Sequence, residues 1–289
     1  MSMRTKTLFA SVNLIGDTIV QTPAIRLYRM QHPDEEIHWV MQDDPARSLF
    51  EAMTESGVCD HVFFDSNWDR IRSLDYNGYH KRFLMDVQAA FRIGKETGVH
   101  IAQAFGRMVQ VSIDSQDVLP SVPMCLRTFD SIGVPPRCLV ISPRSSSNAP
   151  RNGFAGNKNL PWKAWPKIVE RFVQSERIDN HVVLLRDDDP PPEVPMCVLR
   201  MSLCDAVAYI AKACAGGGMY CGVDNGITHI AAGLRVPTYC VYPNGLVSSW
   251  VGYEGFSHYR MARTNPWEGN VDQIWKCWQG ASVDTMPAG

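Results

Sequence analysis

Apolar residues in the first part of the chain form short runs, separated by segments with apolar residues at helical spacing. The short runs predict strands at Thr7–Val12, Glu36–Met41 and His61–Phe64. The segments between them predict helices at Thr18–Met30 and Ala46–Glu55. Strands and helices that alternate in this way predict a parallel sheet with right-handed crossovers. The N-terminal half is therefore expected to open as a doubly wound α/β domain.

The next part of the chain has a weaker pattern. Helices are expected at Lys81–Phe91 and at His100–Val109, where Ile101, Ala104, Phe105 and Met108 share one face. The following segments, Leu119–Pro123 and Ser131–Pro136, are polar and contain prolines. Such composition is typical of a linker, so the boundary between two domains is placed there.

A second α/β pattern follows this linker. Strands are predicted at Cys138–Ser142, His181–Leu185, Tyr220–Val223 and Thr238–Tyr242. Helices are predicted at Trp165–Gln174, Leu203–Cys214, Thr228–Leu234 and Val271–Trp278. We therefore expect an N-terminal Rossmann-like domain (residues 1–134), a C-terminal Rossmann-like domain (135–268), and a final helix and tail (269–289) that packs back on the N-terminal domain.

Composition narrows the class of protein. The chain has 289 residues, of which 45% are hydrophobic and 20% charged, and its net charge is −2. Mean hydropathy is −0.17, and no run approaches the ~18 apolar residues of a membrane-spanning helix. The N-terminal apolar run is too short for a signal peptide, so a cytoplasmic protein is expected. Peripheral contact with a membrane stays open.

The number and positions of the cysteines indicate reduced thiols rather than a disulfide framework. The sequence has nine cysteines, no Cys-x-x-Cys pair, and most cysteines lie in apolar segments. Buried thiols in a reducing compartment fit this distribution better than disulfides or zinc ligands. No metal site is expected.

Loops after strands carry the candidate chemistry, because α/β sheets bind ligands beyond the carboxyl ends of their strands. The turn Asp224-Asn225-Gly226 follows a strand and precedes a helix. The start of a helix offers N–H groups and a positive dipole end, which suits a phosphate. The alternative is an ordinary βαβ connection in which the aspartate only caps the helix.

Two further loops occupy equivalent positions. Gly16-Asp17 follows the first strand, although these residue types are also common at ordinary turns and helix starts. The loop Pro143–Trp162 is rich in hydroxyl groups and glycine and contains Arg144 and Lys158. Such a loop suits a diphosphate, while the alternative is an ordinary surface loop.

The three stretches together resemble one family, the heptosyltransferase-like glycosyltransferases of the ADP-heptose:lipopolysaccharide type (glycosyltransferase family 9). The segment GDTIVQTPA at Gly16–Ala24 is similar to the N-terminal motif of that family. The segment DNGITHIAA at Asp224–Ala232 is similar to its C-terminal motif, and KNLP at Lys158–Pro161 to its Lys-x-Trp-Pro segment. The resemblance implies a GT-B fold, in which two Rossmann-like α/β domains face a central cleft. It also implies that the N-terminal domain is on the acceptor side and that the C-terminal domain binds the nucleotide sugar.

The resemblance also implies a role for each matching residue. Asp17 would be the general base that deprotonates the acceptor hydroxyl, with Asn13 and Gly16 on the acceptor side. The donor would be a nucleoside-diphosphate sugar, bound without a cofactor or metal by Lys158, Arg144, Ser145, Asp224, Asn225, Gly226 and His229. A lysine and a helix dipole stabilise the charge on a leaving diphosphate, and a base on the opposite face gives inversion.

The chain departs from the family pattern at several positions. Asn225 stands where the family usually has Ser or Thr, and the acidic loop Arg186–Asp189 replaces the usual Gly-Gly. The donor sugar and the nucleotide base therefore stay open. Asp187-x-Asp189 has the spacing of a metal-binding motif in GT-A enzymes, but two successive α/β patterns argue against that fold.

Two alternative functions remain. The same chemistry on a modified nucleic-acid base would need a basic surface, for which Arg70, Arg72, Lys81 and Arg82 are candidates. The net acidity disfavours this acceptor only weakly. The other alternative is a sugar-nucleotide-binding protein without catalytic activity, against which the presence of Asp17 and Lys158 argues. A glycan or another hydroxyl compound is the favoured acceptor.

Overall fold

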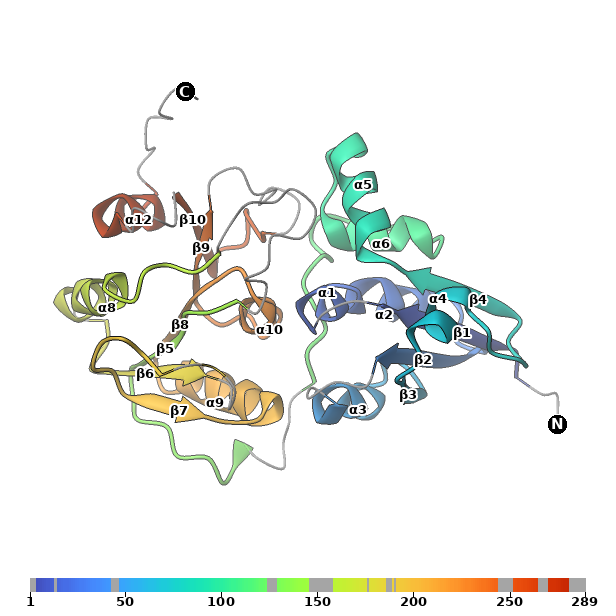
Figure 1. Ribbon diagram of the computed structural model, residues 1–289, viewed down its shortest axis with the longest axis horizontal. Coiled ribbons are helices and arrows are strands. Elements are labelled where there is room, and N and C mark those ends of the chain that lie inside the picture. The colour runs from blue at the N-terminus through green and yellow to red at the C-terminus, as the bar shows by residue number, and fades with distance from the viewer. Residues whose placement is uncertain are drawn as a thin grey trace. The chain divides into compact units, whose positions relative to one another are not determined.

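A computed structural model describes residues 4–12, 15–42, 47–123, 129–145, 158–175, 177–185, 189, 191–243, 252–264 and 270–280 (Figure 1). The chain divides into two compact units, each described by itself. The first unit consists of Met1–Ser131, Ser202–Ala208 and Ser249–Tyr253, and the second of Ile132–Met201, Tyr209–Ser248 and Glu254–Gly289. Asn13 and Asp187, which were singled out in the sequence, lie outside the described residues.

The first unit contains a parallel sheet in the order β3-β2-β1-β4. Its strands are β1 (Lys6–Ser11), β2 (Glu36–Gln42), β3 (His61–Asp65) and β4 (Lys81–Met85). Its helices are α1 (Ile15–Ile19), α2 (Thr22–Gln31), α3 (Arg47–Glu55), α4 (Trp68–Ser73), α5 (Val87–Thr97) and α6 (Ile101–Met108). Leu8, Phe9 and Ala10 of β1 are completely buried, as expected for a central strand covered on both faces.

The single helix expected at Thr18–Met30 is wrong, because two helices meet there. Pro23 has no N–H group to donate to the carbonyl of Ile19, so one continuous helix would lose a bond and clash at this point. The hydroxyl of Thr22 donates to the Ile19 carbonyl instead, at 2.8 Å. Pro23 then lies in the first turn of α2, where its missing N–H costs nothing.

The helix expected at Lys81–Phe91 is also wrong in its first part. Residues 81–85 form β4, which pairs in parallel with β1 from Lys81 opposite Thr7 to Met85 opposite Ser11. The helix α5 begins only after Asp86, whose side chain accepts a hydrogen bond from the Gln88 N–H at 2.8 Å. Tertiary strand pairing and this N-cap therefore divide a segment whose apolar spacing is helical throughout.

The second unit contains a parallel sheet in the order β10-β9-β8-β5-β6-β7. Its strands are β5 (Cys138–Ser142), β6 (Asn180–Leu185), β7 (Val198–Arg200), β8 (Met219–Val223), β9 (Thr238–Pro243) and β10 (Tyr259–Thr264). Its helices are α8 (Ala164–Gln174), α9 (Leu203–Ala215, which begins in the first unit), α10 (Gly226–Gly233) and α12 (Val271–Trp278). Numbered within this unit and read from β7, the order is the 3-2-1-4-5-6 arrangement of a Rossmann fold.

Helices cover both faces of the second sheet (Figure 1). On one face, Leu139 and Ile141 of β5 pack with Trp165 and Phe172 of α8. On the other face, Tyr209 of α9 hydrogen-bonds the Cys138 thiol, and α10 packs on β8. The expectation of two doubly wound α/β units with parallel sheets is confirmed.

The C-terminal helix α12 packs within the second unit. Its buried residues Val271, Ile274 and Trp278 belong to the same core as Trp165 and Phe172 of α8. The indole N–H of Trp278 donates to the Cys240 carbonyl at 3.2 Å. The expectation that this helix packs back on the N-terminal domain is therefore wrong, because its apolar stripe completes the cover of the second sheet.

No helix in the described ranges is long and apolar enough to cross a membrane.

Gly222 of β8 lies where the sheet allows no side chain. A Cβ at this position would stand 2.3 Å from the hydroxyl oxygen of Tyr220 and 3.0 Å from the carbonyl oxygen of Ser142. Tyr220 is completely buried, so its ring cannot move aside at low cost. A glycine here lets Tyr220 lie beneath the strand and reach α10, where its hydroxyl lies 2.9 Å from that of Thr228.

We expect Gly222→Ala to lower the free energy of unfolding by about 1–3 kcal/mol, because the added methyl group overpacks this region. Urea unfolding followed by circular dichroism measures the change. Gly133→Ala is the matched control, since a Cβ there meets nothing within 4 Å, and its effect should stay within about 0.5 kcal/mol. Equal unfolding midpoints for the two variants would contradict the packing argument.

Candidate functional site

The candidate site lies beyond the carboxyl ends of β5 and β8, the two central strands of the second sheet. The strand order reverses between them, which is the switch point where Rossmann-like sheets bind ligands. Ser142 at the end of β5 pairs with Gly222 near the end of β8. The segments that follow, Pro143–Ser145 and Asp224–Gly226, therefore leave the sheet side by side.

Asn225 joins these two segments. Its side-chain Nδ2 donates to the Arg144 carbonyl at 2.8 Å and to the Ser142 hydroxyl at 2.9 Å. Its Oδ1 accepts a hydrogen bond from the Thr228 N–H at 2.9 Å, which makes Asn225 the N-cap of α10. One amide side chain thus caps the helix and crosslinks the loops after β5 and β8. A serine or threonine has too few donor hydrogens for all of these bonds.

The helix α10 begins at Gly226, two residues before the expected Thr228, and its N-cap is Asn225 rather than Asp224. Thr228 anchors its first turn, because the Thr228 hydroxyl donates to the Val223 carbonyl at 2.6 Å. The small residues Ala231 and Ala232 are buried against the sheet. The first-turn N–H groups and the positive end of the dipole therefore lie at the switch point.

Asp224 is a buried carboxylate held by a cation. Its Oδ2 lies 2.6 Å from the Lys158 Nζ, and its Oδ1 lies 3.7 Å from the His229 Nε2. Burial raises the pKa of Asp224, but the positive charge of Lys158, the His229 ring and the hydrogen bond from Lys158 outweigh burial and hold the pKa below its usual value. Asp224 is therefore ionised at neutral pH and positions the Lys158 ammonium next to α10.

His229 lies in the first turns of α10 and is buried. Burial lowers the pKa of His229 to about 4, because the opposing effect of Asp224 is weaker and Lys158 acts in the same direction as burial. The ring is therefore neutral at neutral pH, and its contact with Asp224 is not an ion pair under those conditions. A neutral imidazole at this position supplies a polar atom without adding charge.

The segment before α8 is tied to the end of β5. The Ser145 N–H donates to the Asn159 side chain at 2.7 Å, next to Lys158 in the sequence. Ser145 is buried, Arg144 is half-buried, and a quarter of the Lys158 side chain is exposed. Lys158 thus reaches the switch point from a backbone fixed by Asn159.

The N-terminal candidates lie in the first unit. Gly16 and Asp17 belong to α1, which follows β1 and begins at Ile15. The Val20 N–H donates to the Gly16 carbonyl at 3.2 Å, and Asp17 is half-buried in the first turn. Asn13 lies outside the described residues, so its place in this loop stays a prediction.

A buried polar network supports the end of β1 next to α1. The hydroxyl of Ser11 donates to Gln21, and it accepts a hydrogen bond from the Trp39 indole at 2.8 Å. The Gln21 amide also donates to the Met85 carbonyl at 3.3 Å. Gln21 thereby joins the carboxyl ends of β1 and β4 to the junction between α1 and α2. Nothing in the local sequence pattern distinguishes Gln21 from a surface residue.

Comparison with known proteins gives the same architecture. The structure is similar to a family 9 glycosyl transferase from Veillonella parvula (TM-score 0.64, 13% identity), with 99% of this chain and 93% of that chain covered. It is also similar to ADP-heptose lps heptosyltransferase II from E. coli (TM-score 0.63, 13% identity), with 96% and 99% covered. The chain has the fold of the family 9 glycosyltransferases.

A third solved structure, E. coli heptosyltransferase WaaC with ADP-2-deoxy-2-fluoro heptose, has the same fold (TM-score 0.62, 13% identity), with 93% of this chain and 96% of that chain covered. By sequence, no protein-family profile matches the chain. No curated protein matches it either. The heptosyltransferase-like fold expected from the short motifs is confirmed by the structures.

The structure gathers most of the residues singled out in the sequence. Seven of them lie together at the switch point of the second unit: Arg144, Ser145, Lys158, Asp224, Asn225, Gly226 and His229. Gly16 and Asp17 lie together in α1 of the first unit. Sequence analysis missed Asn159 and Ser142, which fix the loops. The position of Ser142 at the end of a predicted strand was a usable signal, whereas Asn159 stands at the unspecified position of the Lys-x-Trp-Pro segment.

We expect Asn225→Ala to lower the free energy of unfolding by about 2 kcal/mol, because it removes the cap and leaves the Arg144 carbonyl without its amide partner. Asn225→Ser should recover about half of this loss, since serine restores only the cap. Asn270→Ala is the matched control: Asn270 caps α12 by accepting from the Gln273 N–H at 3.1 Å, and its loss should cost about 1 kcal/mol. If Asn225→Ala cost no more than Asn270→Ala, the crosslink would contribute nothing.

We expect the stability of the protein to fall as the pH is lowered from about 6.5 towards 4. His229 has a folded-state pKa of about 4 against an ordinary value of 6.5, so the unfolded chain binds more protons within this range. His229→Gln removes this contribution, which amounts to about 2 kcal/mol between pH ~6.5 and ~5. Urea unfolding across this range measures both slopes, and identical slopes would contradict a neutral, buried His229.

Proposed function

We infer that the protein is an inverting glycosyltransferase, which moves a sugar from a nucleoside-diphosphate sugar to an acceptor hydroxyl without a metal. The observation that carries this proposal is the switch point of the second unit, where the start of α10 and the Lys158 ammonium lie together. Phosphate groups bind at helix starts of this kind in Rossmann-like sheets. The fold shared with family 9 glycosyltransferases supports the same substrate class.

The charges at the switch point suit a leaving diphosphate. Transfer of the sugar leaves negative charge on the terminal phosphate, which Lys158 and the dipole of α10 would stabilise. The Asp224 carboxylate holds Lys158 in place through a 2.6 Å contact. His229 is neutral at neutral pH, so it leaves the charge balance unchanged. This division of roles needs no metal ion to compensate the diphosphate.

Asp17 is the proposed general base. It lies in the first turn of α1, after the carboxyl end of the central strand β1. Its carboxylate would accept the proton of the acceptor hydroxyl while that oxygen bonds to the anomeric carbon and the bond to the diphosphate breaks. Attack from the face opposite the diphosphate makes this a single displacement with inversion. Gln21 and Ser11 fix the backbone that carries this helix through their buried hydrogen bonds. Asn13 and Gly16 complete the proposed acceptor side.

ADP is the first nucleotide to test, because the similar WaaC structure contains it. We expect Lys158→Gln to weaken ADP binding by about tenfold or more, measured by calorimetry, and to leave adenosine binding unchanged. Lys163→Gln, a change at an exposed lysine of the same segment, is the matched control and should bind ADP as the wild type does. Equal ADP affinities for the Lys158 and Lys163 variants would contradict the diphosphate role.

Asp17→Asn tests the catalytic part of the proposal separately. With a panel of nucleoside-diphosphate sugars and glycan acceptors, we expect this variant to release nucleoside diphosphate at least ~100-fold more slowly than the wild type, with nucleotide affinity unchanged. Asp34→Asn, a change at an exposed aspartate of the same unit, should keep full activity. Full activity of Asp17→Asn would exclude Asp17 as the base.

The same assays on the wild type distinguish the two alternative functions. Tight nucleotide binding without turnover on any acceptor would indicate a non-catalytic binding protein. Turnover only on hydroxymethylated DNA would indicate a nucleic-acid acceptor.

A further inference from the structure

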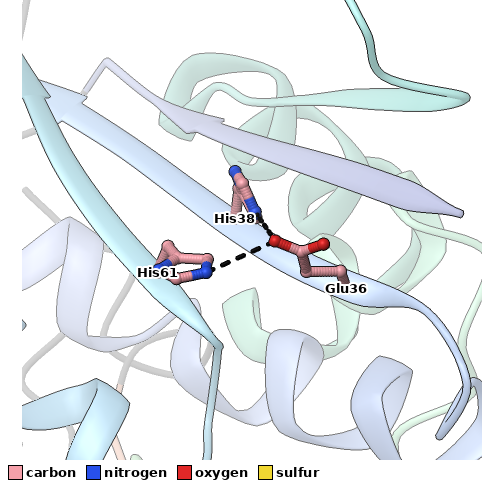
Figure 2. Close-up of side chains that lie close together, drawn as sticks. All are labelled: Glu36, His38 and His61. Atoms are coloured by element: carbon pink, nitrogen blue, oxygen red, sulfur yellow. Dashed lines mark hydrogen bonds and ion pairs between the residues drawn. The ribbon is translucent and has the colours of Figure 1, made fainter. Parts of the chain in front are cut away.

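A cluster of two histidines and one glutamate lies in the first unit, at the opposite end of the sheet from α1. Glu36 and His38 are alternate residues of β2, so their side chains project from the same face (Figure 2). His61 is the first residue of the edge strand β3 and pairs directly with His38. Both imidazoles point to one carboxylate oxygen of Glu36 in Figure 2.

The distances in this cluster approach those of a metal site. The Glu36 Oε1 lies 2.7 Å from the His38 Nε2 and 3.3 Å from the His61 Nε2. One ligand atom from each of the three residues lies within 4.8 Å of the other two. Ligand atoms about 2.0–2.2 Å from a tetrahedral zinc ion lie about 3.3 Å from one another. Small rotamer changes would therefore bring the three atoms around one ion.

The second ring nitrogen of His38 has a suitable partner. The His38 Nδ1 lies 2.8 Å from the hydroxyl oxygen of Tyr79. Without an ion, the His38 Nε2–H donates to the Glu36 carboxylate at 2.7 Å, and the Nδ1 accepts from the Tyr79 hydroxyl. With an ion bound at Nε2, the ring would take the other tautomer, and its Nδ1–H would donate to the same phenol oxygen. Histidine ligands of metal ions are oriented by such a hydrogen bond on the other ring nitrogen.

The charges around the cluster are mixed. The Lys6 Nζ lies 3.6 Å from the Glu36 Oε1 and opposes a cation there, but the Lys6 side chain is exposed and able to turn towards solvent. Asp60 precedes His61 and is paired with Arg29. The His61 side chain is 60% exposed, whereas the His38 side chain is only 13% exposed. An ion at this edge strand would therefore be open to solvent on one side.

We propose that Glu36, His38 and His61 form a binding site for a divalent transition-metal ion of the zinc class, with water as the remaining ligand. Two imidazoles and one carboxylate are a common ligand set for zinc. No metal site was expected from the sequence, in which the cysteines lack ligand spacing. Because the ligands come from β2 and β3, the ion would fasten the edge strand to the sheet. The site is separate from the proposed reaction, and its test does not depend on activity.

Calorimetric titration of the full chain with Zn²⁺, under reducing conditions at neutral pH, tests this proposal. We expect binding of one ion to this cluster, and at least ~10-fold weaker affinity in His38→Gln and in His61→Gln. His80→Gln is the matched control, since His80 is exposed, lies in the same unit and is outside the cluster. Lys6→Gln should tighten binding by about two- to fivefold, because it removes the cation next to Glu36.

Cobalt distinguishes this site from the thiols. Co²⁺ bound by nitrogen and oxygen ligands shows visible ligand-field bands without the near-ultraviolet thiolate-to-metal transition. We expect these bands in the wild type and in His80→Gln, and their loss in His61→Gln. The proposal is overturned if Zn²⁺ does not bind, if His61→Gln and His38→Gln bind it as tightly as the wild type does, or if thiolate transitions account for all bound cobalt.

Discussion

The amide side chain of Asn225 is the interaction on which the candidate site depends. Parallel strands leave the sheet side by side, but the loops that follow them have no backbone ladder to hold them together. Asn225 supplies the missing connection, because its Nδ2 bonds the loop after β5 while its Oδ1 caps α10. The start of the helix and the exit of β5 are thereby held in one arrangement. A phosphate site built from these two segments needs such a connection.

Burial of Asp224 determines the arrangement of charges at the candidate site. A buried carboxylate is costly unless a cation accompanies it, and Lys158 fills that role at 2.6 Å. The same burial keeps His229 neutral, so the pair next to it does not gain a further positive charge. Asp224 thus has two effects at once: it positions a lysine at the start of α10, and its own negative charge balances that lysine. The cap residue Asn225 is uncharged and leaves this balance undisturbed.

In the first unit, different residues fix the carboxyl end of the central strand. Ser11, Gln21 and Trp39 form a buried network at the end of β1, where the second unit uses Asn225 at the end of β8. In both units a side-chain amide satisfies backbone or hydroxyl groups at the point where a central strand gives way to a helix. Buried polar groups of this kind must all be paired, so they fix the local backbone more narrowly than apolar packing alone. The rigid strand ends are what the candidate residues in each unit share.

The sequence by itself determined the alternation of strands and helices, because apolar spacing, caps and turn residues act within a few neighbouring residues. It located β5 and β8, the turn at Asp224-Asn225-Gly226 and the motifs that led to the observed fold. It did not determine β4, since Lys81–Met85 has helical spacing and becomes a strand only by pairing with β1. Tertiary structure likewise decided three further features. These are the edge strands β7 and β10, the packing of α12, and the contacts of Asn225 with residues more than 80 positions away. These features depend on contacts between segments that are distant in the sequence. A local pattern of apolar and polar residues contains no information about such long-range contacts.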